Sequence, residues 1–262
     1  MKKVNYHTHT SRCHHAWGID EEFVLSAIKG GYTELGFSDH SCWKYDSDFI
    51  SHIRMTPEEI DGYCESLLAL KEKYKDQIKI LIGLECEYFP KYMDWLKDFI
   101  KEKKLDYVIF GNHYIDSDEV NDYNGRVLHD NEKLSRYIDD CIAGMSTGLY
   151  SYLCHPDLFM RGRPEFDDFA KKESRRLCEW CKENGVILEY NLEGARMCHL
   201  REVNWYPHIE FWKIAAEVGN DVIIGIDAHR LESLEDDFYY DNAVKTLTEL
   251  GMNIVTDLPL KW

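Results

Sequence analysis

The stretch "VNYHTHTSRCHH" at residues 4–15 combines the end of an expected strand with four histidines and one cysteine. We place this strand at residues 2–8. Successive side chains of a strand point to opposite faces, so His7 and His9, two positions apart, point to the same side. The pair alone does not decide between a metal site and a packed core, and the decision depends on where similar residues recur along the chain.

The rest of the chain alternates between apolar or β-branched runs and segments with helical periodicity. We expect strands at residues 2–8, 34–38, 78–84, 106–111, 150–154, 186–190 and 222–226. We expect helices at residues 20–31, 56–76, 92–104, 131–145, 166–185, 208–219 and 239–251. Seven β/α units require a parallel sheet, and their size suits a closed, TIM-like (β/α)7 barrel in a single domain over residues 1–262. An open, doubly wound sheet is the alternative.

The composition limits the classes of partner. The formal charge is −17, from 31 Lys and Arg against 48 Asp and Glu. This excess of carboxylates argues against a nucleic-acid partner, because proteins that bind duplex DNA neutralise its phosphates with lysine and arginine. No stretch is apolar over the roughly 18 residues of a membrane span, and the first residues lack the apolar segment of a signal peptide. We expect a cytoplasmic protein with no membrane partner.

The cysteines fit reduced thiols. There are nine, an odd number scattered through the chain, which does not suit a disulfide framework. Cys178 and Cys181 form a CxxC pair on an expected helix, and because no second pair completes a zinc site, we interpret them as structural. Cys13 could coordinate a soft metal or pack as a free thiol beside the site.

Metal-binding side chains recur at the ends of the expected strands. In a (β/α) barrel the active site lies at the C-terminal ends of the strands, so side chains at these positions meet. Imidazoles and carboxylates suit Zn, Mn or Fe, and a group of this size exceeds the four ligands of one tetrahedral ion. We therefore expect two to three divalent metal ions. The candidates are His7, His9, His40, Glu85, Glu87, His113, His155, Asp157, Glu189, Asn191, Asp227 and His229.

The remaining histidines divide by position. His14 and His15 are neighbours, and because adjacent side chains usually point in different directions, we expect only one of them at the site. Four others fall in or beside expected helices and loops, where a surface position is expected. These are His52, His129, His199 and His208.

The motifs at these strand ends resemble those of the PHP family, named for polymerase and histidinol phosphatase domains. The resemblance runs from residue 7 to residue 229. "HTHTSRCHH" is similar to the first motif of the family, whose spacing selects His15 over His14. The motifs "SDH", "GLECEY", "GNHYID", "CHPD" and "IDAH" are similar to the later ones and supply His40, Glu85, His113, His155, Asp227 and His229.

The resemblance implies a distorted barrel of seven β/α units that holds up to three metal ions. Carried over to the matching positions, it implies three sets of ligands. They are His7, His9, Glu85 and Asp227 for the first ion, Glu85, His113 and His155 for the second, and His15, His40 and His229 for the third. Because every one of these positions is filled, a metal-free, degenerate domain is not expected.

The resemblance also favours phosphate ester hydrolysis over amide hydrolysis. A metal-dependent amidohydrolase would share the HxH pair but would want a bridging lysine and a single late aspartate, whereas this chain has Glu85 and the pair Asp227 and His229. Divalent ions lower the pKa of bound water to about 7 and clamp phosphoryl oxygens. Our hypothesis is that a hydroxide bridging two ions attacks phosphorus in line, and that Asp227 or His229 assists protonation of the leaving alkoxide.

Two arginines after expected strands are candidates for catalysis and for binding the phosphate. Arg161 lies six residues after His155, and Arg196 lies in "EYNLEGAR", which is similar to the "EINTSGLR" of histidinol phosphatases in the family. The planar fork of arginine donates two hydrogen bonds at once to a phosphate. Leu192 and Glu193 depart from the family pattern at this strand end.

The resemblance thus implies a phosphatase that acts on a small phosphorylated metabolite. L-Histidinol phosphate, from histidine biosynthesis, is the expected substrate. The alternatives are a phosphoesterase acting on nucleotides or another phosphorylated metabolite, and a metal-loaded domain that binds a phosphorylated ligand without turnover. The acidic composition disfavours a proofreading domain of a polymerase.

Overall fold

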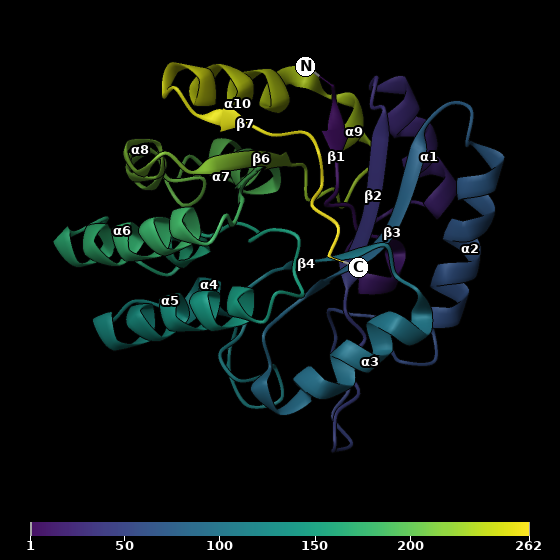
Figure 1. The fold of residues 1–262 in the computed structure, drawn as a ribbon, viewed down its shortest axis with the longest axis horizontal. Coiled ribbons are helices and arrows are strands. Elements are labelled where there is room, and N and C mark those ends of the chain that lie inside the picture. Colours follow the sequence, from purple (N-terminus) through teal and green to yellow (C-terminus); the bar gives the residue numbers. More distant parts are fainter. Residues whose placement is uncertain (1, 262) are drawn as a thin grey trace.

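Figure 1 shows the computed structural model, which describes residues 2–261, with the strands inside and the helices outside. Within this range the strands are β1 Val4–Asn5, β2 Glu34–His40, β3 Lys79–Cys86, β4 Tyr107–Phe110, β5 Leu188–Asn191, β6 Asp221–Gly225 and β7 Asn253–Ile254. The α-helices are α1 Asp20–Lys29, α2 Ile60–Lys73, α3 Met93–Lys103, α4 Asn124–Val127, α5 Asn131–Ser146, α6 Asp168–Glu183, α7 Leu192–Arg201, α8 Ile209–Val218, α9 Glu232–Glu235 and α10 Asp237–Glu249. Short 3-10 turns lie at Ser11–Cys13, Pro90–Tyr92 and Leu158–Arg161.

The paired strands are parallel and follow one another in the order of the chain. β1 to β4 form one run, and β5 to β7 form another. Single bridges from Leu153 to Phe110 and to Leu188 join the two runs, and a bridge from Thr8 to Ala228 joins the last run back to the first. The strands therefore close into a barrel that is distorted because isolated bridges replace full ladders at two places. This order excludes the doubly wound open sheet.

The strand expected at residues 150–154 is reduced to the bridge at Leu153. Ser151 N donates to Val108 O (2.8 Å) and Cys154 N donates to Phe110 O (2.8 Å), so the segment occupies the place of a strand. The chain turns away at the next residue, His155, whose φ of 28° lies outside the extended region. The predicted position was therefore right, and the predicted length was wrong.

A further strand, β7, was not predicted. It pairs with the first two residues of β6, on the side that faces β1. The hydroxyl of Tyr6, just after β1, donates to Thr256 O (2.9 Å), just after β7. The C-terminal segment therefore helps to close the barrel between β6 and β1 at the N-terminal ends of the strands.

Helix α2 is shorter than expected, and helices α4, α7 and α9 were not expected. The helix expected from residue 56 begins at Ile60, because the preceding residues form a turn in which Thr56 N donates to Glu59 Oε2 (2.7 Å). Helix α7 follows β5 without a loop. Asn191 Oδ1 accepts from Gly194 N (2.8 Å) and satisfies a donor of its first turn. The strand end "EYNLEGAR" therefore turns directly into a helix.

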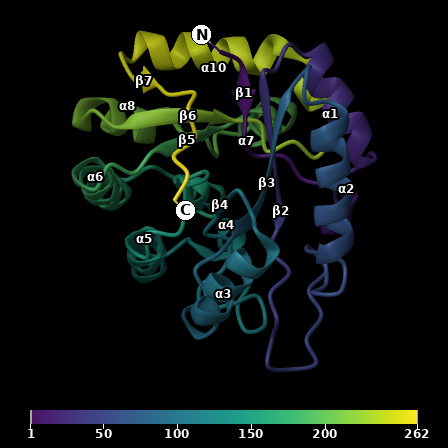
Figure 2. The same cartoon turned by 45° about the vertical axis from the view of Figure 1, so that its right-hand side comes forward.

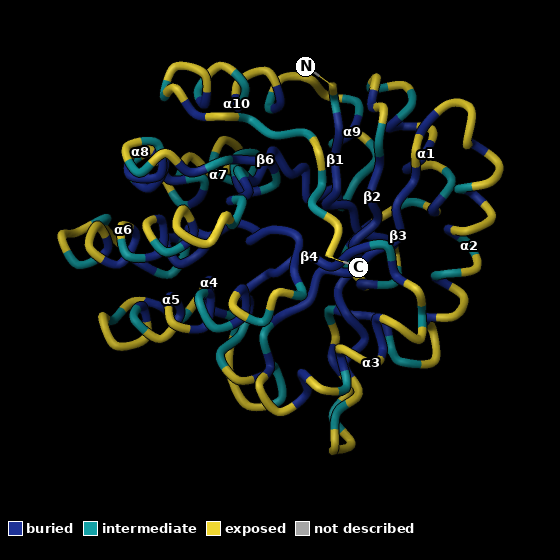
Figure 3. Tube along the Cα trace, in the orientation of Figure 1, coloured by how far each residue is buried: buried dark blue, intermediate teal, exposed yellow. Residues whose placement is uncertain are grey.

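Figures 1 and 2 show α1 and α2 on one side of the barrel and α5, α6 and α8 on the other. Strands β1 to β6 are buried along almost their whole length, whereas β7 is only partly buried and the outer faces of the helices are exposed (Figure 3), as expected for a parallel sheet covered by helices. Cys178 and Cys181 lie on the buried face of α6 as free thiols, which agrees with a structural role. None of the helices within residues 2–261 is long and apolar enough to cross a membrane.

A second, smaller core inside the barrel is built around Tyr107 of β4. Its hydroxyl lies 2.8 Å from Tyr6 O and 3.0 Å from Phe37 O, and the ring is fully buried. Gly36 and Gly83 on the neighbouring strands leave room for it. A Cβ added at Gly83 would lie 2.6 Å from the backbone oxygen of Tyr107, closer than real contacts allow.

We expect Gly83→Ala to lower the free energy of unfolding by roughly 1–3 kcal/mol, because the strand backbone opposite cannot move aside without breaking its ladder. Urea unfolding measures the change. Gly62→Ala on α2 is the control, because its added Cβ meets no atom within 4 Å, and it should be neutral or stabilising by up to about 1 kcal/mol. Equal stability of wild type and Gly83→Ala would contradict the close packing at Tyr107.

Candidate metal centre

All the residues that the family resemblance assigns to metals come together at the C-terminal ends of the strands. His40 ends β2 and Glu85 is the last but one residue of β3, whereas the others lie in the segments that follow the strands. His15 and His229 are half-buried, and the other side chains are buried. The residues of this cluster are His7, His9, His15, His40, Glu85, His113, His155, Asp227 and His229.

Glu85 lies at the centre, and its two carboxylate oxygens face different histidines. Oε2 lies 3.0 Å from His40 Nδ1 and 3.5 Å from His7 Nε2. Oε1 lies 3.0 Å from His155 Nε2 and 3.3 Å from His113 Nε2. A carboxylate placed in this way can bridge two ions, with one oxygen toward each.

Asp227 and His229 bring the last loop of the barrel into the cluster. Asp227 Oδ1 lies 3.0 Å from His9 Nε2. The ring of His229 stacks on those of His9 and His15, with centroid distances of 4.1 and 4.7 Å. One nitrogen from each of His9, His40 and His229 lies within 4.8 Å of the other two. This group adjoins the one around Glu85, so the cluster has room for more than one ion.

Several buried atoms that face the cluster have no hydrogen-bond partner among the described residues. An unpartnered buried polar atom costs about 1–3 kcal/mol, and a divalent cation would pair with several of them at once. Their nitrogen and carboxylate oxygen atoms form a donor set that fits Zn, Mn or Fe. These atoms are His7 Nε2, His9 Nε2, His40 Nδ1, Asp227 Oδ1 and His229 Nε2.

The pKa shifts divide the histidines of the cluster: neighbouring carboxylates outweigh burial and raise the pKa of His7, His9 and His155, whereas the pKa of His40 and His229 is lowered. Burial lowers the pKa of His40 to about 3 and, together with His9, holds the pKa of His229 well below its usual range. Burial works against ionisation of Glu85, but His113 and the other histidines outweigh it and hold the pKa of the Glu85 carboxyl well below its usual range. Neutral imidazoles and ionised carboxylates are the forms that bind metal ions.

Two residues of the cluster have a left-handed backbone. The φ angle is 28° at His155 and 53° at Asp227. Residues other than glycine rarely adopt this conformation, and it persists only where the surrounding structure enforces it. Such strain is common at functional sites, which agrees with the position of both residues in the cluster.

Three carboxylates lie behind histidines of the cluster. The pairs are Glu189 Oε1 with His7 Nδ1 (2.7 Å), Asp39 Oδ1 with His9 Nδ1 (3.3 Å) and Glu87 Oε1 with His113 Nδ1 (3.1 Å). A carboxylate in this place orients the ring and leaves its other nitrogen for a metal. The sequence placed Glu87 and Glu189 among the candidate ligands, whereas in the structure they contact the cluster histidines His113 and His7 from behind. Asp39 was missed, although it directly precedes His40 in the same strand end.

We expect Glu189→Gln to weaken metal binding about 10–100-fold, as is common for partners behind a ligand histidine. Burial alone lowers the pKa of His7, and the charge of Glu189 raises it, so the substitution removes an electrostatic and an orienting effect together. Competition with a chromogenic chelator measures the affinity. Glu34→Gln is the control, because Glu34 pairs with Lys79 at the other end of the barrel. Wild-type affinity in Glu189→Gln would contradict the orienting role.

Of the two other candidates at strand ends, Asp157 faces away from the cluster and Asn191 contacts one of its residues. Asp157 Oδ2 accepts from His208 N (2.6 Å) and Trp212 Nε1 (3.1 Å), and burial raises the pKa of its carboxyl to about 7. Asn191 Nδ2 donates to Asp227 Oδ2 (3.2 Å) and thereby orients that carboxylate. Both side chains are engaged in these hydrogen bonds, and neither belongs to the nine ligands that the resemblance implies.

The turn after β1 directs His15 to the cluster, as the family spacing implied, and leaves His14 outside. His14 is exposed and has a φ of 65°. His15 Nδ1 lies 2.6 Å from Cys13 O, and its ring centroid lies 5.3 Å from that of His40. Cys13 is buried close to His15 and His229. Burial raises the pKa of the Cys13 thiol, which favours a packed thiol over a thiolate ligand.

The expectation of surface positions for four histidines was right in part. His129 and His199 are exposed. His208, just before α8, is buried, and its backbone N–H donates to Asp157 Oδ2. His52 is exposed but lines the cavity above the cluster. The β2 to α2 loop that carries His52 is therefore part of the site, which its sequence did not indicate.

A cavity of about 570 Å³ lies above the cluster, and Arg161 lies in its wall. The guanidinium carbon of Arg161 lies 5.3 Å from the ring centroids of both Tyr123 and Trp205. No carboxylate of residues 2–261 forms an ion pair with it, in a chain with a formal charge of −17. Arg161 therefore lies beside the cluster, and its fork has no carboxylate partner among the described residues.

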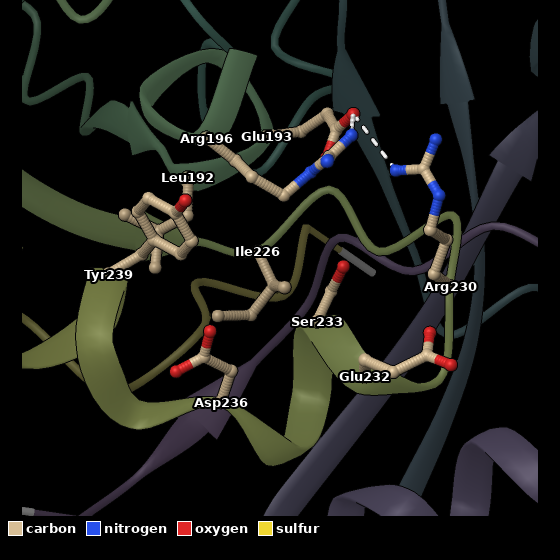
Figure 4. Close-up of a pocket in the computed structure, with 9 residues that line it drawn as sticks. All are labelled: Leu192, Glu193, Arg196, Ile226, Arg230, Glu232, Ser233, Asp236 and Tyr239. Carbon is tan, nitrogen blue, oxygen red and sulfur yellow. Dashed lines mark hydrogen bonds and ion pairs between the residues drawn. The ribbon is translucent and has the colours of Figure 1, made fainter. Parts of the chain in front are cut away.

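Arg196 lies in a side cavity of about 290 Å³ next to the first one (Figure 4). Its Nε and Nη2 donate to the two oxygens of Glu193 at 2.7 and 2.6 Å. Glu193 also lies 3.5 Å from Arg230, and these two residues line both cavities. The structure thus places Arg196 in the side cavity, where its fork donates to Glu193, a residue at which the family pattern differs.

Comparison with known proteins places these features in a family. Residues 5–193 match the PHP domain family. The chain is 27% identical to a probable histidinol-phosphatase of Deinococcus radiodurans, over 95% of this chain and 94% of that protein. It is 31% identical to a probable histidinol-phosphatase of Schizosaccharomyces pombe, over 86% and 80% of the two chains.

A solved structure confirms the fold. The crystal structure of histidinol phosphate phosphatase from Lactococcus lactis, complexed with zinc, L-histidinol and phosphate, has a TM-score of 0.75 to this chain. The two proteins are 19% identical, and the match covers 98% of this chain and 97% of that one. The distorted α/β barrel is thus the fold of these proteins, and the match over residues 5–193 shows the family. The chain belongs to the PHP domain family.

Proposed function

We propose that this PHP domain protein is a metal-dependent phosphatase that hydrolyses L-histidinol phosphate to L-histidinol and phosphate, a reaction of histidine biosynthesis. The observation that carries the proposal is a cavity lined by seven of the nine cluster residues together with Arg161, an arginine without a carboxylate partner among the described residues. The first feature suits divalent ions, and the second suits a phosphate.

The ligand sets implied by the family fit the distances in the cluster. His7, His9, Glu85 and Asp227 would hold the first ion, Glu85, His113 and His155 the second, and His15, His40 and His229 the third. Zn, Mn and Fe are the candidate metals. When bound, such ions provide a nucleophilic water near neutral pH and counter the charge of the phosphoryl group.

The other residues of the cavity bind and orient the substrate. Arg161 donates its fork to phosphoryl oxygens that do not face the metals, and the rings of Tyr123 and Trp205 hold the guanidinium in place. Asp227 or His229, both in the cavity wall, assists the passage of a proton to the leaving alkoxide. Arg196 contributes from the side cavity through Glu193 and Arg230, and not by direct contact with the phosphate.

The substrate is inferred from the relatives and from the cavity. Both relatives named above are described as probable histidinol-phosphatases, and the related Lactococcus lactis structure contains L-histidinol and phosphate. A volume of about 570 Å³ suits a small metabolite. The formal charge of −17 disfavours a polynucleotide.

The test is phosphate release by protein of known metal content from L-histidinol phosphate, mononucleotides, a sugar bisphosphate and an aryl phosphate. A kcat/KM for histidinol phosphate at least tenfold above the others, lost in His7→Ala, supports the proposal. A preference for nucleotides would retain the metal-dependent phosphatase and replace the substrate. Metal-loaded protein that releases no phosphate from any of these compounds would favour a binding domain instead.

A further inference from the structure

Arg54, in the loop between β2 and α2, is a fully buried cation close to the metal centre. Only 2% of its surface is exposed, and all of its polar atoms are engaged. Its Nη1 and Nη2 donate to Glu87 Oε2 (3.0 Å) and Oε1 (2.9 Å) as a fork. Its Nε donates to Asp118 Oδ2 (3.1 Å), and Nη1 also donates to Ser41 O (3.1 Å).

Glu87, the partner of Arg54, connects it to the cluster. Its Oε1 lies 3.1 Å from His113 Nδ1, and its Oε2 accepts from Trp43 Nε1 (2.8 Å). Burial works against ionisation of Glu87, but Arg54 and His113 outweigh it and hold the pKa of the carboxyl far below its usual range. Both oxygens are therefore fixed, and the orientation of the carboxylate depends on the guanidinium.

The ring of His113 is oriented by this carboxylate. Because Nδ1 faces Glu87, the opposite nitrogen, Nε2, faces the interior of the cluster. It lies 3.3 Å from Glu85 Oε1 and 3.3 Å from His155 Nε2. The contacts from Arg54 to Glu87 and from Glu87 to His113 thus end at the proposed position of the second ion.

The same arginine holds a loop that faces the cavity. His52 and Ile53, the two residues before Arg54, line the cavity above the cluster. Asp118, which follows β4, accepts from Ser51 Oγ (2.8 Å) as well as from Arg54, so the loop is tied to a second loop of the same cavity wall. The position of His52 and Ile53 therefore depends on Arg54.

A buried ion pair is poor evidence for a stabilising role, because the desolvation of two charges offsets much of their attraction. Apolar side chains would fill the same space with less desolvation. An arginine here is better explained by what its fork orients than by stability. The orientation affects both a metal-binding histidine and the loop against which a substrate lies.

We propose that Arg54 is a positioning residue that joins the cavity-lining loop at residues 41–59 to the second metal position through Glu87 and His113. This inference rests on the proposed function, since it needs an ion at that position. It predicts that metal affinity at one position and the KM for the substrate change together when the fork of Arg54 is lost.

The experiment titrates metal-free protein with cobalt(II) alone and follows the visible spectrum and the number of ions bound. Arg54→Lys keeps the charge and loses the fork. We expect it to weaken one of the cobalt-binding steps about 10–100-fold, to alter the spectrum of that step, and to leave the other steps unchanged. KM for histidinol phosphate should rise several-fold. Arg54→Met, which loses the charge as well, should weaken the same cobalt-binding step and raise KM by more than Arg54→Lys does.

The control is Arg176→Met, which removes an arginine that also pairs with a buried glutamate, Glu173, but on the outer helix α6. It should bind cobalt as wild type does. Arg54→Met leaves two buried carboxylates without a cation, so its folding is checked by circular dichroism. If Arg54→Met does not fold, the result for Arg54→Lys is used as the test. If Arg54→Lys folds and binds cobalt with the affinity and spectrum of the wild type, the inference is overturned and the proposed function is not. Wild-type protein that binds no cobalt would overturn both the inference and the proposed function.

Discussion

Glu85→Gln is expected to reduce phosphate release by roughly 10²–10⁴-fold, and to do so by removing bound metal. Glu85 is the residue whose two oxygens face both groups of histidines, at 3.0 Å from His40 and 3.0 Å from His155. Loss of one charged partner from a buried group of charges costs about 3–5 kcal/mol, which corresponds to roughly 10²–10⁴-fold in affinity. Activity and metal content, measured on the same preparation, test this expectation.

The control for this substitution is Glu173→Gln, which removes a buried carboxylate that pairs with Arg176 far from the cluster. It should keep its metal and its activity, even if it is less stable. Excess Zn or Mn should restore part of the activity of Glu85→Gln, because weakened sites fill at higher concentration. Full activity of Glu85→Gln at stoichiometric metal would contradict the bridging position of this carboxylate.

Arg161→Met is expected to lower kcat/KM for histidinol phosphate by on the order of 10²-fold, without loss of metal. A hydrogen bond to a charged group contributes about 1.5–3 kcal/mol, and each 1.36 kcal/mol is a factor of ten in rate. Methionine keeps most of the length and the contacts with Tyr123 and Trp205, but it has no donor. Steady-state kinetics together with metal analysis separate phosphate binding from metal loss.

The comparison variant is Arg196→Met, in which the lost fork faced Glu193 and not the cavity above the cluster. We expect a smaller decrease, under about tenfold, because the effect must pass through Glu193 and Arg230. A larger loss in Arg196→Met than in Arg161→Met would contradict the roles that the geometry favours for the two arginines.

Much of the fold could be predicted because it depends on local patterns. Alternating strands and helices of regular length indicate a barrel, and six of the expected strands lie where β1 to β6 are found. Residues 56–59 were predicted as the first turn of the helix, and they form a separate turn in which Glu59 N donates to Thr56 O (3.1 Å). Strand β7 was missed because its two residues are set by pairing with β6, which a local pattern does not show.

Most of the cluster could be predicted because its residues stand at strand ends, a position that the sequence itself defines, whereas His15 was selected only by the spacing of the family motif. The residues around it could not, because their roles depend on partners far away in the chain. Arg54 pairs with Glu87 and Asp118 across three loops, and His52 reaches the cavity only because that loop is held down. Arg196 follows a predicted strand but is turned into a side cavity by Glu193, on the same unexpected helix.

The most direct measurement is the rate of phosphate release from L-histidinol phosphate while metal-free protein is titrated with Zn or Mn. The proposed function predicts no release without metal, a rise as ions are added, and a plateau at two to three ions for each chain. Protein that binds these ions without releasing phosphate, or that is equally active without them, would contradict a metal-dependent phosphatase.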